Sequence, residues 1–483
     1  MFWVIRALVL GLWTLDFGLW TLVLRLGIKG PRPKTKDPRP KTQDQSPTPA
    51  IMRIILNTFG SFGDIHPYMA IAMELQRRRH TPVIATMEIY REKIERAGLE
   101  FVPVRPNIPQ PREQDAELIE KIMEPKSGPR FLTETLIFPA VRESYEDLLK
   151  AAARADLLVT HPAAPAGPLV GRKTGMPWIS TVLAPFSFIS AYDPPVPPFW
   201  QWTKNLSLLG PGVMRFLLNL SKRTYKAKAV TKFRDELGLP DTGNPMFEGQ
   251  HSPARVLALF SELFARPQPD WPPQTRVTGF CFYDGHHEVT VPPELTHFLD
   301  NGPPPIVFTL GSSAVWVARD FFRESIDAAR HLGRRAVLLI GDERNLPTLV
   351  PEGVMVLDYV PYQSLLPKAA AVVHHGGVGT TSQGLLAGVP TLIVPFAFDQ
   401  SDNADHARRL GTSRTLYRKN YLAPRVATEL YELLKQPAYA RRAIEVSQNL
   451  KLENGPGRAA DLIEEAVTGP LHSAGELAYA SRN

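Results

Sequence analysis

The stretch from Ala370 to Asn403 limits more than any other what this chain can fold into. It reads AAVVHHGGVGTTSQGLLAGVPTLIVPFAFDQSDN. The apolar residues 370–374 predict a buried strand, the glycines after them predict a turn, and the segment 379–387 predicts a helix. Residues 391–394 predict a second buried strand. A strand, a helix and a strand in this order are typical of an α/β fold with a parallel sheet.

The turn after the first of these strands has the composition of an anion-binding site. Glycine lets the backbone approach a ligand closely, and the N–H groups and dipole at a helix start favour negative charge. His375 and the hydroxyls of Thr380 and Thr381 add donors, so a diphosphate fits better than a single carboxylate. After the second strand, Asp399 and Gln400 place a carboxylate beside an amide. Such a pair is suited to hold the hydroxyls of a sugar.

Length and charge narrow the class of protein. The chain has 483 residues, which is too many for one core, so two or more domains are expected. The net charge is +7, but residues 1–50 hold eight basic and three acidic side chains, and the charges in the remainder nearly balance. We therefore expect no nucleic-acid partner. A single cysteine, Cys281, excludes an internal disulfide, offers no metal cluster and fits a reducing compartment.

Residues 1–28 differ from the rest and predict a membrane-anchor helix. The segment 7–24 is almost entirely apolar and has the length of a bilayer-spanning helix. A charged Asp16 at the middle of a bilayer-spanning helix would cost free energy, so a helix that lies in the membrane interface is an alternative. Residues 29–50 predict a basic, proline-rich linker, whose charge places the rest at the cytoplasmic face of the membrane. If translation instead starts at Met52, the protein is cytoplasmic without an anchor.

From Met52 onward, predicted strands and helices alternate. This pattern predicts two Rossmann-like, doubly wound α/β domains that face a central cleft. We expect the N-terminal domain over 51–290, the C-terminal domain over 291–470 and a tail over 471–483. The anion-binding turn falls in the second of these domains.

The loop after the first predicted strand, 52–56, carries Asp64. Open α/β sheets bind ligands beyond the carboxyl ends of their strands, so Asp64 is expected at such an edge. A helix is predicted from about Pro67 to Arg79. Because Asp64 follows a glycine and precedes that helix, it could also be only a cap or turn residue.

The segment 194–239 interrupts the alternation. It begins with PPVPPFWQW and continues with a helix that combines apolar residues such as Phe216 with several lysines and arginines. Two readings stay open: an acceptor pocket with a membrane-facing helix, or an ordinary amphipathic helix packed on its own domain. Farther on, His286 and His287 lack a third ligand at metal spacing, so no metal site is expected.

Two stretches resemble the fingerprints of a known family. GSFGDIHPY at 60–68 and the run from Val360 to Ala404 are similar to motifs of family 1 glycosyltransferases. The bacterial branch with the rhamnolipid rhamnosyltransferase, the glycopeptide-antibiotic glycosyltransferases and the sterol glucosyltransferases is the most similar, and FARPQPDWPPQTRVTGFCFYDG at 264–285 adds to this likeness. The resemblance covers about 52–467. It implies inverting, metal-independent enzymes with the GT-B fold of two Rossmann-like domains.

The resemblance also implies roles for residues of this chain. Tyr359 would stack on the nucleotide base, and the backbone of Val360 would bond the base edge. The expected diphosphate-binding residues are Ser312, His375, Gly377, Gly379 and Thr380, and those expected at the sugar are Asp399 and Gln400.

The general base is expected in the GSFGD motif, beside Gly63, which is also predicted at the donor. The resemblance implies Asp64 as the base that takes the proton of the acceptor hydroxyl. His66 is the rival candidate, because its unperturbed pKa suits a general base better than that of an aspartate. Many UDP-sugar enzymes of the family have a glutamate for the ribose where this chain has Gln383, so the sequence leaves UDP and dTDP open.

These observations predict an inverting glycosyltransferase. It would move a hexose or deoxyhexose from a UDP- or dTDP-sugar, with no cofactor or metal, to a hydroxyl of an apolar acceptor such as a lipid or natural product. The anchor and the aromatic loop favour a lipid and a membrane surface as partners. The alternatives are a GT-B sugar-nucleotide epimerase and a catalytically silent protein that binds sugar nucleotides or lipids.

Overall fold

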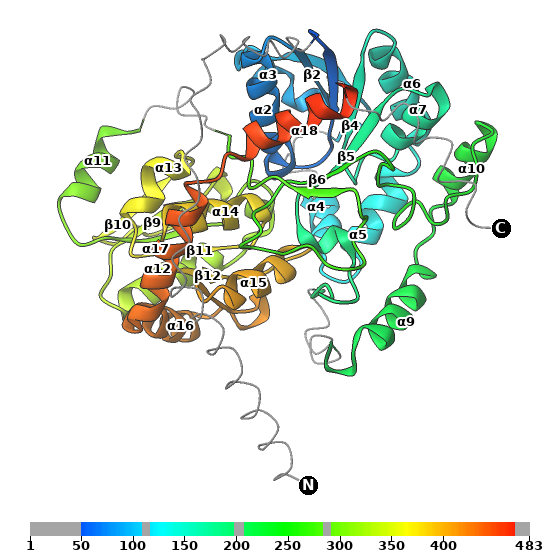
Figure 1. The fold of residues 1–483 in the computed structure, drawn as a ribbon. Helices are drawn as coiled ribbons and strands as arrows, with labels where there is room; N and C mark the ends of the chain where they lie inside the picture. The colour runs from blue at the N-terminus through cyan, green and yellow to red at the C-terminus, as the bar shows by residue number, and fades with distance from the viewer. Residues whose placement is uncertain (1–49, 109–115, 198–206, 284–290, 469–483) are drawn as a thin grey trace, which may run out of the picture. The chain divides into compact units, whose positions relative to one another are not determined.

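The computed structural model describes residues 50–108, 116–197, 207–283 and 291–468 (Figure 1). The predicted anchor at 1–28, nearly all of the linker, both adjacent histidines and the tail at 471–483 lie outside the described residues. Within the described part of the chain, no helix is both long and apolar enough to cross a membrane.

The N-terminal half is built on a seven-stranded parallel sheet in the order β3-β2-β1-β4-β5-β6-β7. The strands are β1 (Arg53–Asn57), β2 (Thr81–Thr86), β3 (Glu100–Pro103), β4 (Leu157–Thr160), β5 (Trp178–Val182), β6 (Val256–Ala258) and β7 (Thr275–Val277). The helices are α2 (Phe62–Arg77), α3 (Arg91–Arg96), α4 (Ala116–Ile122), α5 (Gly128–Phe131), α6 (Val141–Ala152), α7 (Ala166–Thr174), α9 (Pro211–Lys222) and α10 (Lys228–Glu236). Short turns of 3₁₀ helix include Pro185–Phe188 and Ser207–Leu209.

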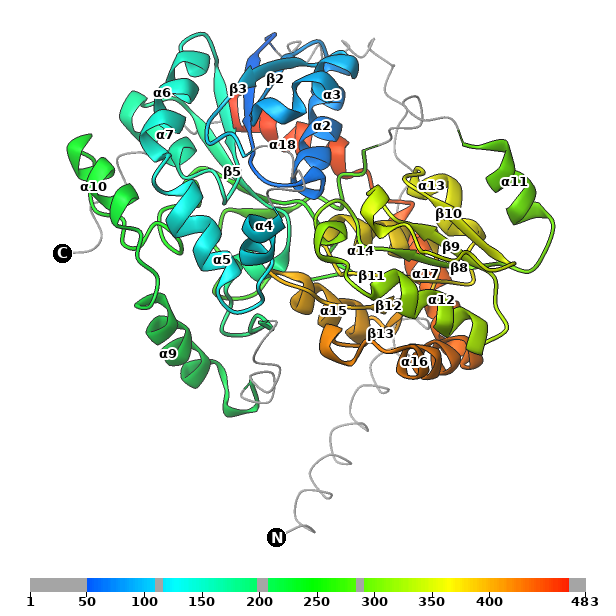
Figure 2. The same ribbon diagram turned by 180° about the vertical axis from the view of Figure 1, so that it is seen from behind.

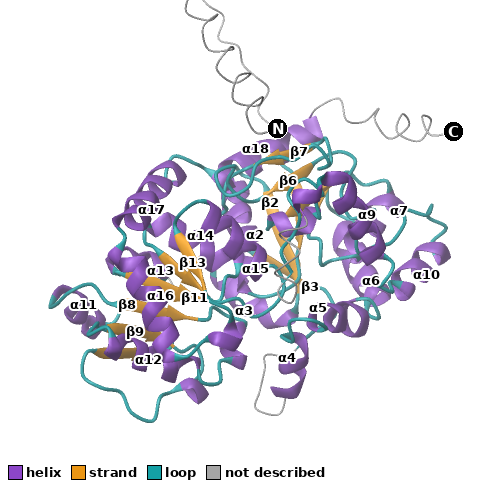
Figure 3. Ribbon diagram, turned by 90° about the horizontal axis from the view of Figure 1, so that it is seen from below, coloured by secondary structure: helices purple, strands orange, loops and turns teal. Residues whose placement is uncertain are grey.

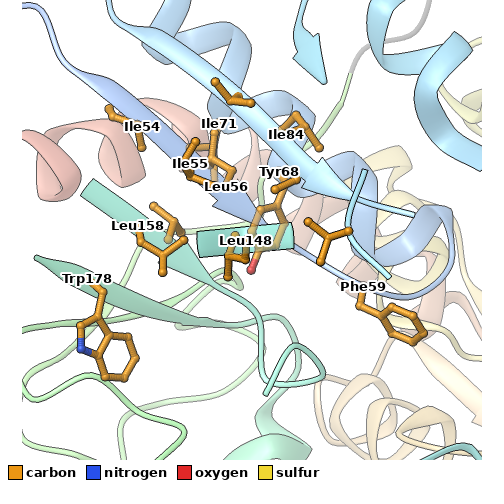
Figure 4. Close-up of a cluster of buried hydrophobic side chains, with 14 of the residues drawn as sticks. Ile54, Ile55, Leu56, Phe59, Tyr68, Ile71, Ile84, Leu148, Leu158 and Trp178 are labelled. Carbon is orange, nitrogen blue, oxygen red and sulfur yellow. The ribbon is translucent and has the colours of Figure 1, made fainter. Parts of the chain in front are cut away.

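The central strands are mostly apolar because helices cover both faces of the sheet. In β1, Ile54, Ile55 and Leu56 have no exposed surface. Figure 4 shows them packed with Leu158 of β4 and Tyr68 of α2. This core holds the carboxyl ends of β1 and β4 side by side, with Asn57 paired to Thr160 in parallel register.

The C-terminal half has a six-stranded parallel sheet in the order β10-β9-β8-β11-β12-β13. The strands are β8 (Ile306–Thr309), β9 (Ala336–Leu339), β10 (Val354–Leu357), β11 (Ala371–His374), β12 (Thr391–Ile393) and β13 (Ser413–Thr415). The helices are α11 (Pro293–Asp300), α12 (Phe321–His331), α13 (Tyr362–Leu365), α14 (Val378–Ala387), α15 (Gln400–Arg409), α16 (Ala423–Lys435), α17 (Pro437–Leu450) and α18 (Gly455–Thr468). Figure 3 shows strands between helices in both halves.

Both sheets reverse their strand order at one point. In the first sheet the reversal lies between β1 and β4, and in the second it lies between β8 and β11. At such a switch point the loops leave neighbouring strands in opposite directions, which opens a crevice for ligands at the carboxyl edge. The segments after these four strands are therefore where binding and catalysis are expected.

The last helix, α18, returns to the N-terminal half (Figure 2). Ala459, Ala460 and Ile463 are buried in the same core as β1. Arg78 at the end of α2 forms ion pairs with Asp461 at 2.7 Å and Glu464 at 2.8 Å. The predicted limits 291–470 assign this helix to the C-terminal domain by sequence order, whereas its side chains complete the N-terminal core. The difference arises because long-range packing leaves no local signal.

Candidate active site

The starts of two helices from different halves meet at the candidate site. Helix α2 begins shortly after β1, and helix α14 begins shortly after β11, so each starts at a switch point. A Cβ added to Gly379 in α14 would lie 3.6 Å from the Cα of Gly63 in α2. Two helix starts therefore converge, and the dipole of each favours negative charge between them.

Asp64 is the third residue of α2 and takes part in its cap. The backbone N–H of Ser61 donates to Asp64 Oδ2 at 2.8 Å, and the N–H of Gly63 donates to Ser61 Oγ at 3.2 Å. This capping box starts the helix at Phe62, earlier than the predicted start at Pro67. Asp64 is thus a capping residue, but the cap engages Oδ2 and leaves Oδ1 for another contact.

His161 is the partner of that second oxygen, and the sequence analysis missed it. It follows β4, and its Nε2 lies 3.5 Å from Asp64 Oδ1. The N–H of Ala163 donates to His161 Nδ1 at 3.0 Å, so in the neutral ring the proton is on Nε2 and faces the carboxylate. A histidine directly after a buried strand was the available signal, because that position lies at the ligand-binding edge.

His66, the rival base, is placed differently. Its ring stacks on Phe62, with ring centroids 5.3 Å apart, and on Tyr283, with centroids 5.0 Å apart. Residues two apart on a helix do not face each other, so the side chains of His66 and Asp64 leave α2 in different directions. The structure therefore brings His161 to Asp64 and places His66 in an aromatic stack.

The backbone at Gly311 and Gly377 packs closely against the ring of His375. A Cβ on Gly311 would lie 2.5 Å from His375 Cε1, and a Cβ on Gly377 would lie 2.4 Å from His375 Nε2. Gly376 has φ +92°, and a Cβ there would meet the carbonyl of Gln400 at 2.9 Å. These close approaches explain why the turn needs glycine on both sides of the ring.

His375 itself is suited to a ligand hydrogen bond. It is 5% exposed, and its Nδ1 has no hydrogen-bond partner among the described residues. Burial lowers the pKa of the imidazole to about 4, so the ring is neutral at physiological pH. A buried polar nitrogen without a partner is costly unless a ligand satisfies it. The neighbouring His374 holds the turn, since its Nδ1 accepts the N–H of Gly376 at 3.1 Å, while its Nε2 is buried without a hydrogen-bond partner among the described residues.

Hydroxyl groups line the same edge of the sheet. The hydroxyls of Tyr362 and Thr309 lie 3.0 Å apart, and Thr380 lies in the first turn of α14. Gln383 follows Thr380 by three residues on α14 and lies on the same side of the helix. Ser312 is exposed just beyond β8, the strand beside β11.

Asp399 connects this turn to the segment after β12. The side-chain amide of Asn403 donates to Asp399 Oδ2 at 2.8 Å and to the carbonyl of Gly376 at 3.0 Å. Burial raises the pKa of Asp399 to about 7, the hydrogen bond from Asn403 opposes this, and the charge of Asp64 adds to it. The carboxylates of the two halves are thus close enough to influence each other.

Gln400 has a contact that the sequence did not predict. Its side chain is 3% exposed, and its Oε1 accepts the N–H groups of Phe396 at 2.8 Å and Ala397 at 3.0 Å. Buried backbone N–H groups require partners, and the carboxamide oxygen supplies them. The side chain expected at the sugar therefore holds the loop before α15 through its oxygen, which leaves only the amide nitrogen for a ligand.

The residues expected at the nucleotide base lie at the opposite end of this edge. Tyr359 follows β10 and is 56% exposed, whereas Val360 is fully buried. A partly exposed ring beside a fixed backbone segment is compatible with base stacking. Among the described residues, no three acidic, histidine or cysteine side chains are grouped as metal ligands.

Comparison with known proteins decides the family. Residues 54–157 match the glycosyltransferase family 28 N-terminal domain, and residues 324–465 match the erythromycin biosynthesis protein CIII-like C-terminal domain. The chain is 31% identical over 427 residues to O-mycaminosyltylonolide 6-deoxyallosyltransferase of Streptomyces fradiae. The aligned region covers 86% of this chain and 97% of that relative. The chain belongs to the family 1 glycosyltransferases.

Other comparisons agree with this assignment. The glycosyltransferase is 28% identical over 432 residues to a sterol 3-beta-glucosyltransferase of Arabidopsis thaliana, covering 85% of this chain and 67% of the relative. The structure of the spinosyn forosaminyltransferase SpnP matches with a TM-score of 0.63 at 18% identity, over 86% of this chain and all of SpnP. The expected GT-B fold of two Rossmann-like domains is therefore confirmed, and the glycosyltransferase is an enzyme, as predicted.

Proposed function

We propose that the enzyme transfers a hexose or deoxyhexose from a UDP- or dTDP-sugar to a hydroxyl of an apolar acceptor, with inversion at the anomeric carbon. One observation carries this proposal. Asp64, with Oδ1 outside the helix cap, lies near the glycine-rich turn that holds the unpartnered His375 nitrogen. A base beside an anion site is what such a transfer requires.

On the donor side, the diphosphate would bind at the start of α14. Gly377 and Gly379 leave the backbone accessible there, and the helix dipole favours the negative charge. His375 and Thr380 would add hydrogen bonds, Tyr359 would stack on the base, and Asp399 would accept hydrogen bonds from the hydroxyls of the sugar. As the bond from the sugar to the diphosphate breaks, these groups would stabilise the charge on the departing oxygen.

On the acceptor side, Asp64 would act as the general base. The acceptor hydroxyl forms the new bond to the anomeric carbon, and its proton passes to the Asp64 carboxylate while the diphosphate leaves with the bonding electrons. His161 acts as a positioning residue, since its N–H faces Oδ1 and the Ser61 N–H holds Oδ2. These two contacts fix the orientation of the carboxylate.

The acceptor class is supported by the relatives. The named activities of two of them are transfer to a macrolide, O-mycaminosyltylonolide, and transfer to sterols. Both acceptors are large, apolar molecules with hydroxyl groups. We extend that class, a natural product or a lipid such as a sterol, to this enzyme.

The test is a turnover assay with separate donors. The protein is incubated with UDP-glucose or dTDP-rhamnose in the presence of a sterol, a macrolide aglycone or a lipid extract, and mass spectrometry detects glycosylated acceptor. NMR of the product then determines whether the anomeric configuration is inverted. Conversion of the donor without acceptor would indicate an epimerase, and binding of donors without any turnover would contradict the proposal.

A further inference from the structure

Helix α9 carries an apolar stripe on its outer side. Val213, Phe216, Leu217 and Leu220 follow the spacing i, i+3, i+4 and i+7, which places them on one face of the helix. The exposed fractions are 41% for Val213, 68% for Phe216 and 52% for Leu220. A stripe of this kind normally packs against a core, so its exposure requires an explanation.

Side chains of α9 outside the stripe contact the protein. Met214 is 5% exposed, and Lys222 Nζ forms an ion pair with Glu248 Oε1 at 3.1 Å. The side chain of Asn244 also donates to the carbonyl of Lys222 at 3.3 Å. Val213, Phe216 and Leu220 are therefore not packed against the described part of the N-terminal half, to which α9 is attached through Met214 and Lys222.

The turn before the helix extends the same apolar surface. Leu208 is 88% exposed and Leu209 is 60% exposed, directly before α9. Figures 1 and 2 show α9 at the periphery of the N-terminal half, away from the strands of the sheet. We call Leu208, Leu209, Val213, Phe216 and Leu220 the α9 surface.

Charge indicates what covers this surface. The segment 207–233 contains six basic side chains and no acidic one. Arg215 lies on α9 and Arg223 directly follows it. Lys226 and Lys228 come next in the chain, whereas Lys222 is paired with Glu248 and Lys232 with Glu236. Exposed apolar side chains on a helix with basic neighbours match an interface of hydrocarbon beneath anionic headgroups. We propose that the α9 surface docks the enzyme on an anionic lipid bilayer.

The same region adjoins the proposed acceptor side, and this part of the inference rests on the proposed function. A pocket lined by His161, Pro165 and Leu169 also includes Glu248 in its wall. His161 contacts Asp64, and Glu248 pairs with Lys222 of α9. A bilayer on the α9 surface would therefore lie on the side of the enzyme where the acceptor hydroxyl must arrive.

A fluorescence experiment on the full chain tests the docking without any need for turnover. Cys281 is the only cysteine and is buried, so an environment-sensitive fluorophore would label the new thiol of Val213→Cys. Vesicles of phosphatidylcholine with phosphatidylglycerol should shift its emission to shorter wavelength and raise its intensity, whereas phosphatidylcholine alone should not. A label at Leu452→Cys, where the side chain is 85% exposed outside the α9 surface, should not respond.

Substitutions then separate the apolar and the charged contributions. We expect Phe216→Asp to lower partitioning into anionic vesicles by about tenfold or more. The pair Arg215→Glu and Arg223→Glu should do the same, with a strong dependence on salt. Leu349→Asp and Lys451→Glu make matched changes at exposed positions elsewhere and should leave binding unchanged.

Three outcomes would overturn the proposal. If vesicles bind but the label at 213 does not respond, the membrane contact lies elsewhere in the chain. If the label responds to protein concentration without vesicles, a second copy of the chain covers the surface. An equal response to neutral vesicles would contradict the role of charge. Affinity for dTDP, measured by calorimetry on the same variants, should not change, so failure of docking is distinguishable from failure of the proposed function.

Discussion

At the switch point of the C-terminal sheet, the segments after β8 and β11 present glycines, hydroxyls and a neutral histidine. At the switch point of the N-terminal sheet, the segments after β1 and β4 present a carboxylate and a second histidine. The backbone geometry of the two edges is alike, since each has a helix start beside a strand reversal. The chemistry differs because the turn residues differ: glycine exposes N–H groups to an anion, whereas Ser61 and Asp64 use them for a helix cap.

This contrast implies a division of labour, in which one edge binds and the other performs proton transfer. Changes at the N-terminal edge should then lower turnover and leave donor affinity unchanged. Changes at the C-terminal edge should lower donor affinity as well.

The largest effect is expected for Asp64→Asn. Loss of the general base should lower kcat by about 10²–10⁴-fold. The asparagine oxygen can still accept the Ser61 N–H, so the helix cap and the melting temperature should change little. Steady-state kinetics and calorimetry with dTDP or UDP measure the two quantities, and Ser61→Ala, which weakens the cap without removing the carboxylate, is the control. If Asp64→Asn lowered donor affinity as strongly as it lowers kcat, the assignment of donor binding to the C-terminal edge alone would be contradicted.

The pH dependence of stability tests the link between the two edges. The pKa of Asp399 is raised to about 7 in the folded protein, so its contribution to stability is full below about pH 4 and is lost as the pH rises through about 7. The loss amounts to at most about 4 kcal/mol. Denaturant unfolding of the wild type and of Asp399→Asn from pH 4 to 8 should show the difference, with the variant gaining relative stability as the pH rises.

The charge of Asp64 is one cause of that shift, so Asp64→Asn should move the transition of Asp399 to lower pH. An unchanged transition would mean that the two carboxylates do not influence each other.

His375→Ala should weaken the donor side. We expect a fall in kcat of about 10²–10³-fold, because one donor to the leaving diphosphate is lost. In contrast to Asp64→Asn, affinity for dTDP should fall as well, and calorimetry measures it. Retained affinity with reduced turnover would place His375 outside the diphosphate site.

The smallest effect is expected for His161. Removal of the imidazole that faces Asp64 Oδ1 at 3.5 Å by His161→Leu should lower kcat by roughly 10- to 100-fold, because one contact that orients the carboxylate is lost. His161→Gln retains an N–H donor and should recover part of the activity. The pH–rate profile of the leucine variant should move as well, since the environment of Asp64 changes. Equal losses in both variants without a change of profile would indicate a purely structural role.

Local sequence patterns were sufficient to predict most strands and helices of the fold. Continuous apolar runs predicted the buried strands, and glycines beside His375 predicted the turn, because such patterns act over a few residues. The resemblance of the two motifs gave the family, which the 31% identical relative bears out. The roles of Asp64, Asp399 and the diphosphate-binding residues stay predictions that the experiments above test.

Contacts between distant residues depended on the tertiary structure. Asp64 meets His161 because β1 pairs with β4, and nothing within a short window of sequence contains that pairing. Gln400 turns inward because two backbone N–H groups need its oxygen, and His66 is held by Tyr283 from a distant segment. Helix α18 completes the N-terminal core for the same reason: burial of apolar surface rewards contact in space without regard to order in the chain.

The sequence by itself determined the two parallel sheets and the glycine-rich turn, since both depend on local pattern and on positions that only glycine can occupy. The tertiary structure decided which side chain faces Asp64 and which face of α9 remains exposed. Helical spacing shows that a stripe exists, but only the exposure of Phe216 and the contacts of Met214 and Lys222 reveal which side chains of α9 touch the described part of the protein.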